Sequence, residues 1–263
     1  MYKGYHLSAD LSDFNFIKQH DCDIFYKDMN NKIINSIKNF YFQSKDFNDF
    51  IIDGTKLQNF CFPLSNQHVF ISHSHNDIDL VKKISYMLKI ILKIDVFVDS
   101  FIWSYANDLL HIIDDEYCYR PKIEAYDYNA RNFSTSHVHM MLNNALHSMI
   151  DNCECLLFLN TKNSINEHFK DPKTSSPWIM SEIYFSSVVR RKPNRFILGY
   201  ESLAQDKAIT ATTEEQNLNI LYSMNLKHLI DIDSNNFIDW VIKSEKNKEY
   251  GYEALNRLYK NYL

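Results

Sequence analysis

His68-Val69-Phe70-Ile71-Ser72 opens the stretch of sequence that decides the fold, and this stretch continues to residue 99. The short apolar run predicts a buried strand, and the polar residues that follow it predict a turn. Between residues 78 and 92, apolar side chains recur every three or four positions, which indicates an amphipathic helix. Asp95-Val96-Phe97-Val98-Asp99 predicts a second short strand. A strand, a helix and a second strand in this order are the unit from which parallel sheets are built.

The same alternation of strands and helices continues along the chain. Further apolar runs predict strands at 155–159, 195–200 and 228–232, and helical patterns fall at 136–151, 177–191 and 236–243. Short, continuously apolar strands indicate a sheet that is covered by helices on both faces. Because crossovers between parallel strands are right-handed, we expect an α/β fold with a flavodoxin-like, doubly wound sheet of five parallel strands.

Three regions are expected along the chain. Residues 1–66 are interpreted as a small helical N-terminal extension, because apolar residues between 33 and 41 recur at helical spacing. Residues 67–245 form the main domain, and residues 246–263 form a C-terminal helical tail that packs back on it. Residues 100–134 are interpreted as a long connection with a short helical piece at 109–113. Long connections in compact domains are often binding loops or lids.

The composition is ordinary for a soluble globular protein, with 45% hydrophobic and 23% charged residues. A formal net charge of -5 gives no electrostatic reason to expect a nucleic-acid partner. No apolar run approaches the ~20 residues that span a bilayer, and the N-terminus lacks the apolar core of a secretory signal. The five cysteines are irregularly spaced and do not suggest a disulfide framework, so we expect a cytoplasmic protein without a membrane partner.

Two common kinds of site are not expected. The four glycines lie far apart, which excludes the glycine-rich loops that bring backbone close to phosphate in many nucleotide-binding proteins. His73-x-His75 and His137-x-His139 match no known zinc spacing, and no cysteine pair lies near them. We therefore expect no metal and no resident cofactor.

Glu182 is the most informative single residue. Ser176 and Pro177 predict the start of a helix, because a hydroxyl can cap it and the proline ring suits its first position. Within that helix, Glu182 falls on an apolar stripe together with Trp178, Ile179, Ile183, Phe185 and Val189. Burying an ionised carboxylate is costly unless something pairs with it. Glu182 is thus either a structural ion-pair partner or a working group in a cleft.

Candidate ligand-binding residues gather where the predicted strands end. In an open parallel sheet, ligands bind outside the carboxyl ends of the strands. Hydroxyls, aromatic rings and acids follow the first two predicted strands here: Ser72, His73, Ser74, Asp99, Phe101, Trp103 and Tyr105. The helix with Trp178 and Glu182 begins at the same edge. Hydroxyls can bind phosphate oxygens, and aromatic rings can stack on flat rings of a ligand.

Three motifs together resemble Toll/interleukin-1 receptor (TIR) domains. They are Val69-Phe70-Ile71-Ser72 followed by Asp77, the strand that ends in Phe97-Val98-Asp99, and Trp178-x-x-x-Glu182 at the start of a helix. The resemblance covers roughly residues 67–245. Two features depart from the family pattern, namely the N-terminal extension and the expanded second loop. These departures leave the product and the partners of the protein open.

The resemblance implies an enzyme. Enzymatic TIR domains use the glutamate of the Trp-x-x-x-Glu helix to cleave the nicotinamide–ribose bond of NAD, and Glu182 occupies that position. Bacterial members serve anti-phage defence, as in the Thoeris systems, and some make cyclic or otherwise modified ADP-ribose signals for a separate effector. We therefore expect an NAD nucleosidase or cyclase with Glu182 as the catalytic residue, with Trp178 shaping the site, and with self-association through the TIR domain.

Two alternatives remain open at the level of sequence. The first is a TIR scaffold without enzymatic activity, which would act only by assembling with other TIR domains. The second is an enzyme similar to the nucleoside deoxyribosyltransferases, which also place a carboxylate near a ribose on a related sheet. Activity on free nucleosides but not on NAD would distinguish this second alternative.

Overall fold

The computed structural model describes residues 1–27, 53–98, 100–166, 169, 171–191 and 220–261. Its centre is one parallel sheet of five strands in the order β3-β2-β6-β1-β9. The strands are β1 (Lys3–Ser8), β2 (Val69–Ser72), β3 (Val96–Val98), β6 (Cys155–Asn160) and β9 (Ile230–Asp233). The predicted α/β class and the all-parallel five-stranded sheet are confirmed.

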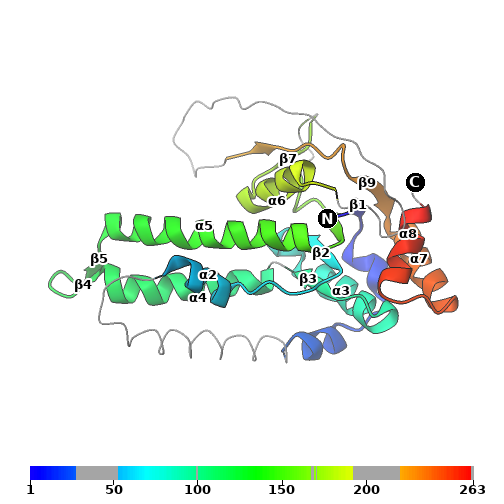
Figure 1. Ribbon diagram of the computed structural model, residues 1–263, viewed down its shortest axis with the longest axis horizontal. Helices are drawn as coiled ribbons and strands as arrows, with labels where there is room; N and C mark the ends of the chain where they lie inside the picture. The colour runs from blue at the N-terminus through cyan, green and yellow to red at the C-terminus, as the bar shows by residue number, and fades with distance from the viewer. Residues whose placement is uncertain (28–52, 99, 167–168, 170, 192–219, 262–263) are drawn as a thin grey trace.

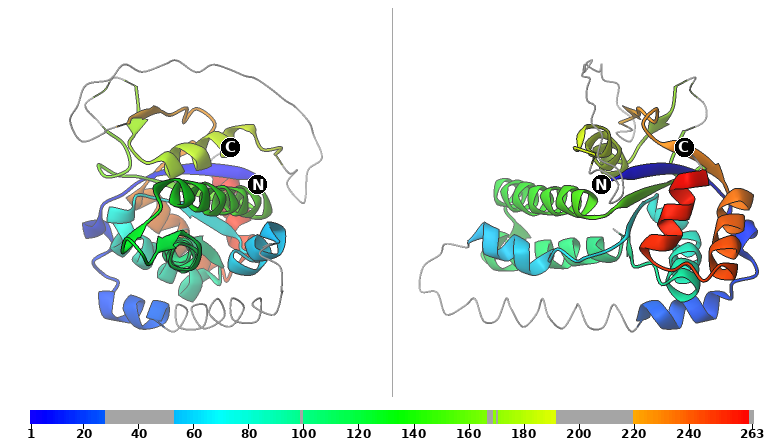
Figure 2. Two further views of the ribbon diagram at one scale, coloured as in Figure 1. Left: turned by 90° about the vertical axis from the view of Figure 1, so that its left-hand side faces the viewer. Right: turned by 45° about the vertical axis from the view of Figure 1, so that its right-hand side comes forward.

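Helices cover both faces of the sheet (Figure 1, Figure 2). One face packs against α3 (Ile78–Leu92), α7 (Ser234–Lys246) and α8 (Tyr252–Asn261). The other face packs against α2 (Gly54–Cys61), α4 (Ser100–Ile113), α5 (Tyr128–Asn152) and α6 (Pro177–Val188). Strand β2 contributes to both cores, with Val69 and Ile71 on the α3 face and Phe70 on the α5 face. All four of its residues are buried, which is why its sequence is continuously apolar.

The beginning of the chain corrects the prediction for residues 1–66. Residues 3–8 form β1, a strand inside the sheet, and not part of a separate helical extension. Strand β1 pairs with β6 along its whole length, from Lys3 beside Cys155 to Ser8 beside Asn160. The sequence did not reveal this strand because polar residues and a glycine interrupt its apolar residues. Helix follows at 19–27 and in α2, whereas the apolar pattern at 33–41 lies outside the described residues.

Strand β1 also changes the expected strand order. A flavodoxin-like sheet has the order 2-1-3-4-5, and β3, β2, β6 and β9 keep the places of its second, first, third and fifth strands. The fourth place, beside β6, is taken by β1. The run at 195–200, which we predicted to be the fourth strand, lies outside the described residues.

The segment after β3 is not a long loop but a helical arm. Helix α4 continues into a short π-helix (Asp114–Cys118), a small antiparallel hairpin of β4 (Tyr119–Arg120) and β5 (Ala125–Tyr126), and α5. Helix α5 therefore begins at Tyr128 and not at the predicted residue 136. Asp127 caps it, because its side chain accepts a hydrogen bond of 3.0 Å from the Ala130 amide. The tip of this arm lies at one end of the molecule (Figure 1).

The last helices close the other end of the molecule. The Trp240 indole in α7 donates a hydrogen bond of 2.8 Å to the Ala254 carbonyl in α8. Leu255, Leu258 and Tyr259 of α8 are buried in the core of the α3 face. Strands β7 (Lys173–Thr174) and β8 (Tyr222–Ser223) form a second small antiparallel pair. None of the helices in the described part of the chain is long and apolar enough to cross a bilayer.

Candidate functional site

Glu182 lies in the second turn of α6 and is almost completely buried, with 1% of its surface exposed. The helix begins as predicted, because the Ser176 hydroxyl accepts a hydrogen bond of 3.2 Å from the Ile179 amide and Pro177 occupies the first position. Glu182 shares the buried face with Ile179 and Ile183. The sequence therefore correctly indicates a carboxylate within the apolar face of this helix.

Ser72 holds this carboxylate. Its hydroxyl donates a hydrogen bond of 2.6 Å to Glu182 Oε2, and Ser72 itself is completely buried. Hydrogen bonds from a hydroxyl to a carboxylate are short and strong when the acceptor is charged. Because Ser72 is the last residue of β2, the bond places Glu182 at the carboxyl end of that strand. Ser72 was expected to contact a ligand directly, but in this structure it faces Glu182.

The next two residues occupy different environments. His73 is buried, and its Nε2 lies 3.0 Å from the Ser100 hydroxyl at the start of α4. His73 therefore links the loop after β2 to the helical arm. Ser74 is partly exposed and precedes a single 3-10 turn (His75–Asp77), where its carbonyl accepts a hydrogen bond of 2.8 Å from the Asp77 amide.

Asp77 joins two loops at the same edge of the sheet. It is buried, and its carboxylate accepts hydrogen bonds from the Thr161 hydroxyl at 2.6 Å and from the Asn163 side-chain Nδ2 at 2.7 Å. Although Asp77 precedes α3 directly, its side chain makes no capping hydrogen bond at the start of that helix. Its partners follow β6, so Asp77 fixes the loop after β2 against the loop after β6. The polar run at 161–164 is the only sequence signal for this contact.

Trp178 is partly buried and packs on the core of the α5 face. Its ring meets His139 of α5 edge-on at 5.4 Å between ring centroids. A second contact between these helices involves His147, whose Nε2 lies 2.9 Å from the Ser181 hydroxyl and whose ring stacks on Phe185 at 4.2 Å. Burial lowers the pKa of His147, which favours its neutral form. These contacts fix α6, and therefore Glu182, against α5.

The remaining predicted ligand contacts cannot be placed. Asp99 lies outside the described residues, as do the side chains of Phe101, Trp103 and Tyr105. Their backbone belongs to α4, which starts immediately beyond β3. The structure thus brings Ser72, Glu182 and His73 to one edge of the sheet.

A histidine and an aspartate near this edge were missed by the sequence analysis. Ser72, Phe158, His6 and Asp231 are register neighbours in one row across β2, β6, β1 and β9. His6 Nδ1 lies 2.8 Å from Asp231 Oδ1, and the His6 ring stacks on Phe158 at 5.6 Å. The sequence did not indicate the pair of His6 and Asp231, because strand β1, which carries His6, was not predicted.

The described residues include no group of three or more His, Cys, Asp or Glu side chains that could hold a metal ion. Two buried carboxylates lie at this edge: Asp77, which connects two loops, and Glu182, which accepts a hydrogen bond from Ser72. Compared with family models, curated proteins and solved structures, the chain shows no significant match.

Proposed function

We propose that this protein is a TIR-type enzyme that cleaves the nicotinamide–ribose bond of NAD, with Glu182 as the catalytic carboxylate. One observation supports this proposal above the others: Ser72 holds the buried Glu182 carboxylate at the carboxyl end of β2. Ligands bind at this edge of open parallel sheets. The TIR resemblance assigns the same function to the same residue from the sequence alone.

The proposed chemistry needs one carboxylate and no metal. In NAD the nicotinamide ring carries a positive charge, and it departs as a neutral molecule, so its departure needs no general acid. The C1′–N bond breaks with its electron pair on nicotinamide, and positive charge develops on the ribose as in glycoside hydrolysis. A fixed carboxylate stabilises that charge without reorganising, which is the most effective form of electrostatic catalysis. Water or a hydroxyl of the same nucleotide then bonds to C1′ and loses its proton.

Because Glu182 is buried, the proposed reaction requires a change of conformation before NAD can reach it. With 1% of its surface exposed, Glu182 cannot touch a ribose until the residues around it separate. The conformation described here is therefore the closed state of the proposed enzyme. We expect NAD to bind after an opening at the carboxyl ends of β2 and β6, in line with activation by a trigger such as phage infection.

The proposal is tested by incubating the full-length protein with NAD and recording a mass spectrum of the products, with Glu182→Gln as the matched control. We expect free nicotinamide together with ADP-ribose or an ADP-ribose derivative, and neither from the variant. NAD that stays intact with concentrated protein and with extracts of phage-infected cells would reject the proposal. Cleavage of free nucleosides without cleavage of NAD would instead support an enzyme similar to the nucleoside deoxyribosyltransferases.

A further inference from the structure

His6 of β1 and Asp231 of β9 form a pair on the same face of the sheet as Glu182. Tyr5 and Leu7 belong to the core of the α3 face, so His6 between them points to the opposite face, on which α6 lies. His6 Nδ1 lies 2.8 Å from Asp231 Oδ1. Because an ionised carboxylate only accepts hydrogen bonds, this contact assigns the proton of the neutral ring to Nδ1 and leaves the lone pair on Nε2.

Nε2 of His6 is buried, and none of the described residues forms a hydrogen bond with it. Only 15% of the His6 side chain is exposed, whereas 91% of the Asp231 side chain is exposed. A pair with a purely structural role would not need a buried acceptor without a partner, because such an acceptor is unfavourable. Nε2 is therefore suited to a ligand that brings a hydrogen-bond donor.

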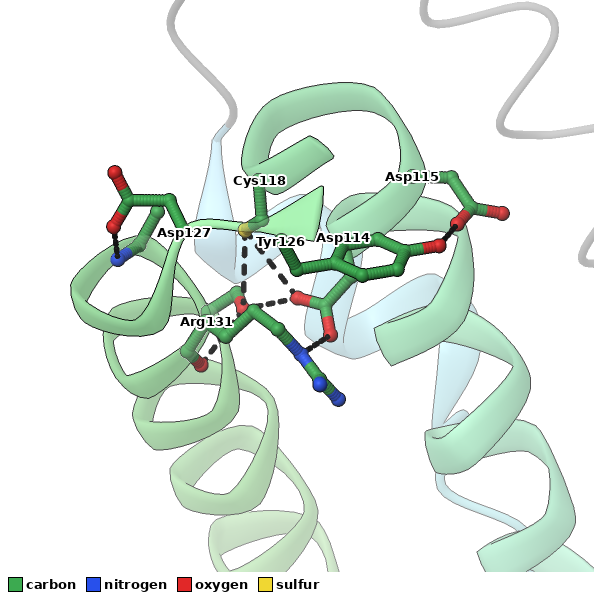
Figure 3. A network of polar contacts seen from close by, with 8 residues as sticks. Asp114, Asp115, Cys118, Tyr126, Asp127 and Arg131 are labelled. Carbon is green, nitrogen blue, oxygen red and sulfur yellow. Dashed lines mark hydrogen bonds and ion pairs between the residues drawn. The ribbon is translucent and has the colours of Figure 1, made fainter. Parts of the chain in front are cut away.

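A buried polar cluster on the helical arm shows the contrasting case of a network that is complete within the protein (Figure 3). Arg131 Nε donates to Asp114 Oδ2 at 2.9 Å, and the Ser134 hydroxyl donates to Asp114 Oδ1 at 2.5 Å. Burial would raise the pKa of Asp114, but the hydrogen bonds from Ser134, Arg131 and Cys118 outweigh burial and keep that pKa below its usual value. Both oxygens of Asp114 have partners, so this cluster needs no ligand, unlike the ring of His6.

The register of the sheet places His6 near the Glu182 carboxylate. Ser72, Phe158 and His6 are neighbours in one row across β2, β6 and β1, and the Phe158 ring stacks on the His6 ring at 5.6 Å. Neighbouring strands lie ~4.8 Å apart, so the backbones of Ser72 and His6 are separated by roughly 10 Å. In glycoside hydrolases that hold a water between two catalytic groups, these groups are about 6.5–9.5 Å apart. The row therefore has the dimensions to place a ribose and its acceptor between Glu182 and His6.

We propose that His6 is the general base that activates the acceptor in the second half of the reaction, and that Asp231 positions it. This inference rests on the proposed cleavage of NAD. After nicotinamide has left, the oxygen of water or of an alcohol bonds to C1′, its O–H bond breaks, and the proton passes to His6 Nε2. Asp231 stabilises the imidazolium that forms, and the proton then passes to solvent.

The proposal fixes the chemical class of the acceptor. A lone pair on Nε2 binds a group that carries a proton, such as water or a ribose hydroxyl, whereas an ionised phosphate oxygen brings no donor. The opening that Glu182 requires also lies next to His6, because β1 pairs with β6. One change of conformation can therefore expose both groups to the substrate.

Labelled nicotinamide separates the two halves of the reaction. Nicotinamide attacks C1′ with the lone pair of its ring nitrogen, so its return to NAD releases no proton and needs no base. Water and alcohols lose a proton when they attack. The experiment incubates the full-length protein with NAD and deuterated nicotinamide, and a mass spectrum compares the label in NAD with the amount of ADP-ribose and its derivatives.

His6→Asn removes Nε2 but keeps a side-chain N–H that can donate to Asp231. We expect this variant to incorporate label much as the wild type does, while formation of ADP-ribose and its derivatives falls by ~100-fold or more, because a general base contributes that much. His68→Asn is the matched control. The His68 side chain is also 15% exposed and paired with an aspartate, Asp95, but it lies at the amino end of β2 and should keep the wild-type ratio.

Asp231→Asn tests the positioning role at an exposed side chain. An asparagine amide can donate to Nδ1, which moves the ring proton to Nε2 and blocks its action as a base. Nitrogen NMR spectra of the His6 ring, recorded without substrate, should show the proton on Nδ1 in the wild type and on Nε2 in the variant. The ratio of ADP-ribose products to label should fall in the variant as well.

An unchanged product ratio in His6→Asn overturns the proposal, and so does an equal fall of both products, which would assign His6 a role in binding or folding. A ring proton on Nε2 in the wild type also overturns it. In each of these cases a wild type that releases nicotinamide leaves the proposed function standing. A wild type that neither releases nicotinamide nor takes up label rejects the proposed function and this inference together.

Discussion

The hydrogen bond between Ser72 and Glu182 joins residues that are 110 positions apart in the chain. An ionised carboxylate that leaves water loses its hydration, and the Ser72 hydroxyl supplies a hydrogen bond in its place. In the proposed reaction, this carboxylate stabilises the positive charge that develops on the ribose. Ser72 therefore acts on the proposed reaction through Glu182, as a positioning residue.

Ser72→Ala tests this role of the hydroxyl. A hydrogen bond to a charged group is worth about 1.5–3 kcal/mol, so we expect nicotinamide release to fall roughly 10- to 100-fold. The loss should appear in kcat more than in KM, because the Ser72 hydroxyl acts by positioning Glu182. Ser148→Ala, at an exposed hydroxyl in α5, serves as the control. A loss of activity that is explained by a lower urea midpoint of Ser72→Ala, with kcat per folded molecule unchanged, would assign Ser72 a purely structural role.

His228 makes the stability of the protein depend on pH. Burial, and second the positive charge of Arg191, lower the pKa of His228 to about 4 from an ordinary value of 6.5. The unfolded chain therefore takes up a proton first, and stability present above pH 6.5 is lost progressively as the pH falls toward 4. We expect the urea midpoint to drop between pH 7 and pH 5, and to drop less in His228→Asn. The same drop in that variant as in the wild type and in His20→Asn would contradict this assignment.

At the residue scale, the sequence predicted the position of Glu182 but not its partner. The apolar stripe around Glu182 is local, since it repeats within one helix, and local patterns can be read from sequence. The hydrogen bonds from Ser72 to Glu182 and from the loop after β6 to Asp77 form between segments that are far apart in the sequence. A local sequence pattern cannot predict such contacts. The pair of His6 and Asp231 was missed for the same reason, because its detection requires the strand order.

At the element scale, β1 is the feature that most affects the fold. Strands β2, β3 and β6 were predicted because they are buried on both faces and their sequences are continuously apolar. Strand β1 is also internal, but Gly4 and His6 interrupt its apolar residues. A Cβ atom at Gly4 would lie 2.5 Å from Leu229 Cδ2, so a glycine allows the neighbouring segment to pack closely there. Gly4 leaves room for the Leu229 side chain, and the same glycine interrupts the apolar pattern by which a strand is predicted from sequence.

Leu7→Ala tests whether β1 is part of the folding unit. Leu7 is completely buried in the core of the α3 face, and shortening such a side chain to alanine costs about 2–5 kcal/mol. We expect the urea midpoint of the whole protein to fall accordingly. Leu11→Ala, at an exposed leucine just after the strand, should change stability by less than about 0.5 kcal/mol. Equal midpoints for the two variants would place β1 outside the cooperative core.

The helical arm was the other element that sequence analysis misjudged. Its tyrosines and aspartates suggested a loop, but tertiary contacts such as those of Asp114 with Arg131 and Ser134 stabilise helix there. These contacts cross the turn between α4 and α5. The helical pattern in the sequence is weak, but α4 and α5 stabilise each other because they pack together.

At the scale of the whole molecule, Glu182 and the tip of the helical arm lie in different parts of the fold. The Glu182 carboxylate lies at the carboxyl edge of the sheet, whereas the hairpin of β4 and β5 lies at the end of the molecule opposite to α7 and α8 (Figure 1).

The most direct test of the central claim is the rate of nicotinamide release from NAD by the wild type and by Glu182→Gln, measured at one protein concentration under the same activating conditions. We expect release by the wild type and a loss of at least about 100-fold in the variant, with an unchanged urea midpoint. Equal rates for the two proteins would contradict it, because the bond would then be cleaved without the carboxylate that Ser72 holds in place.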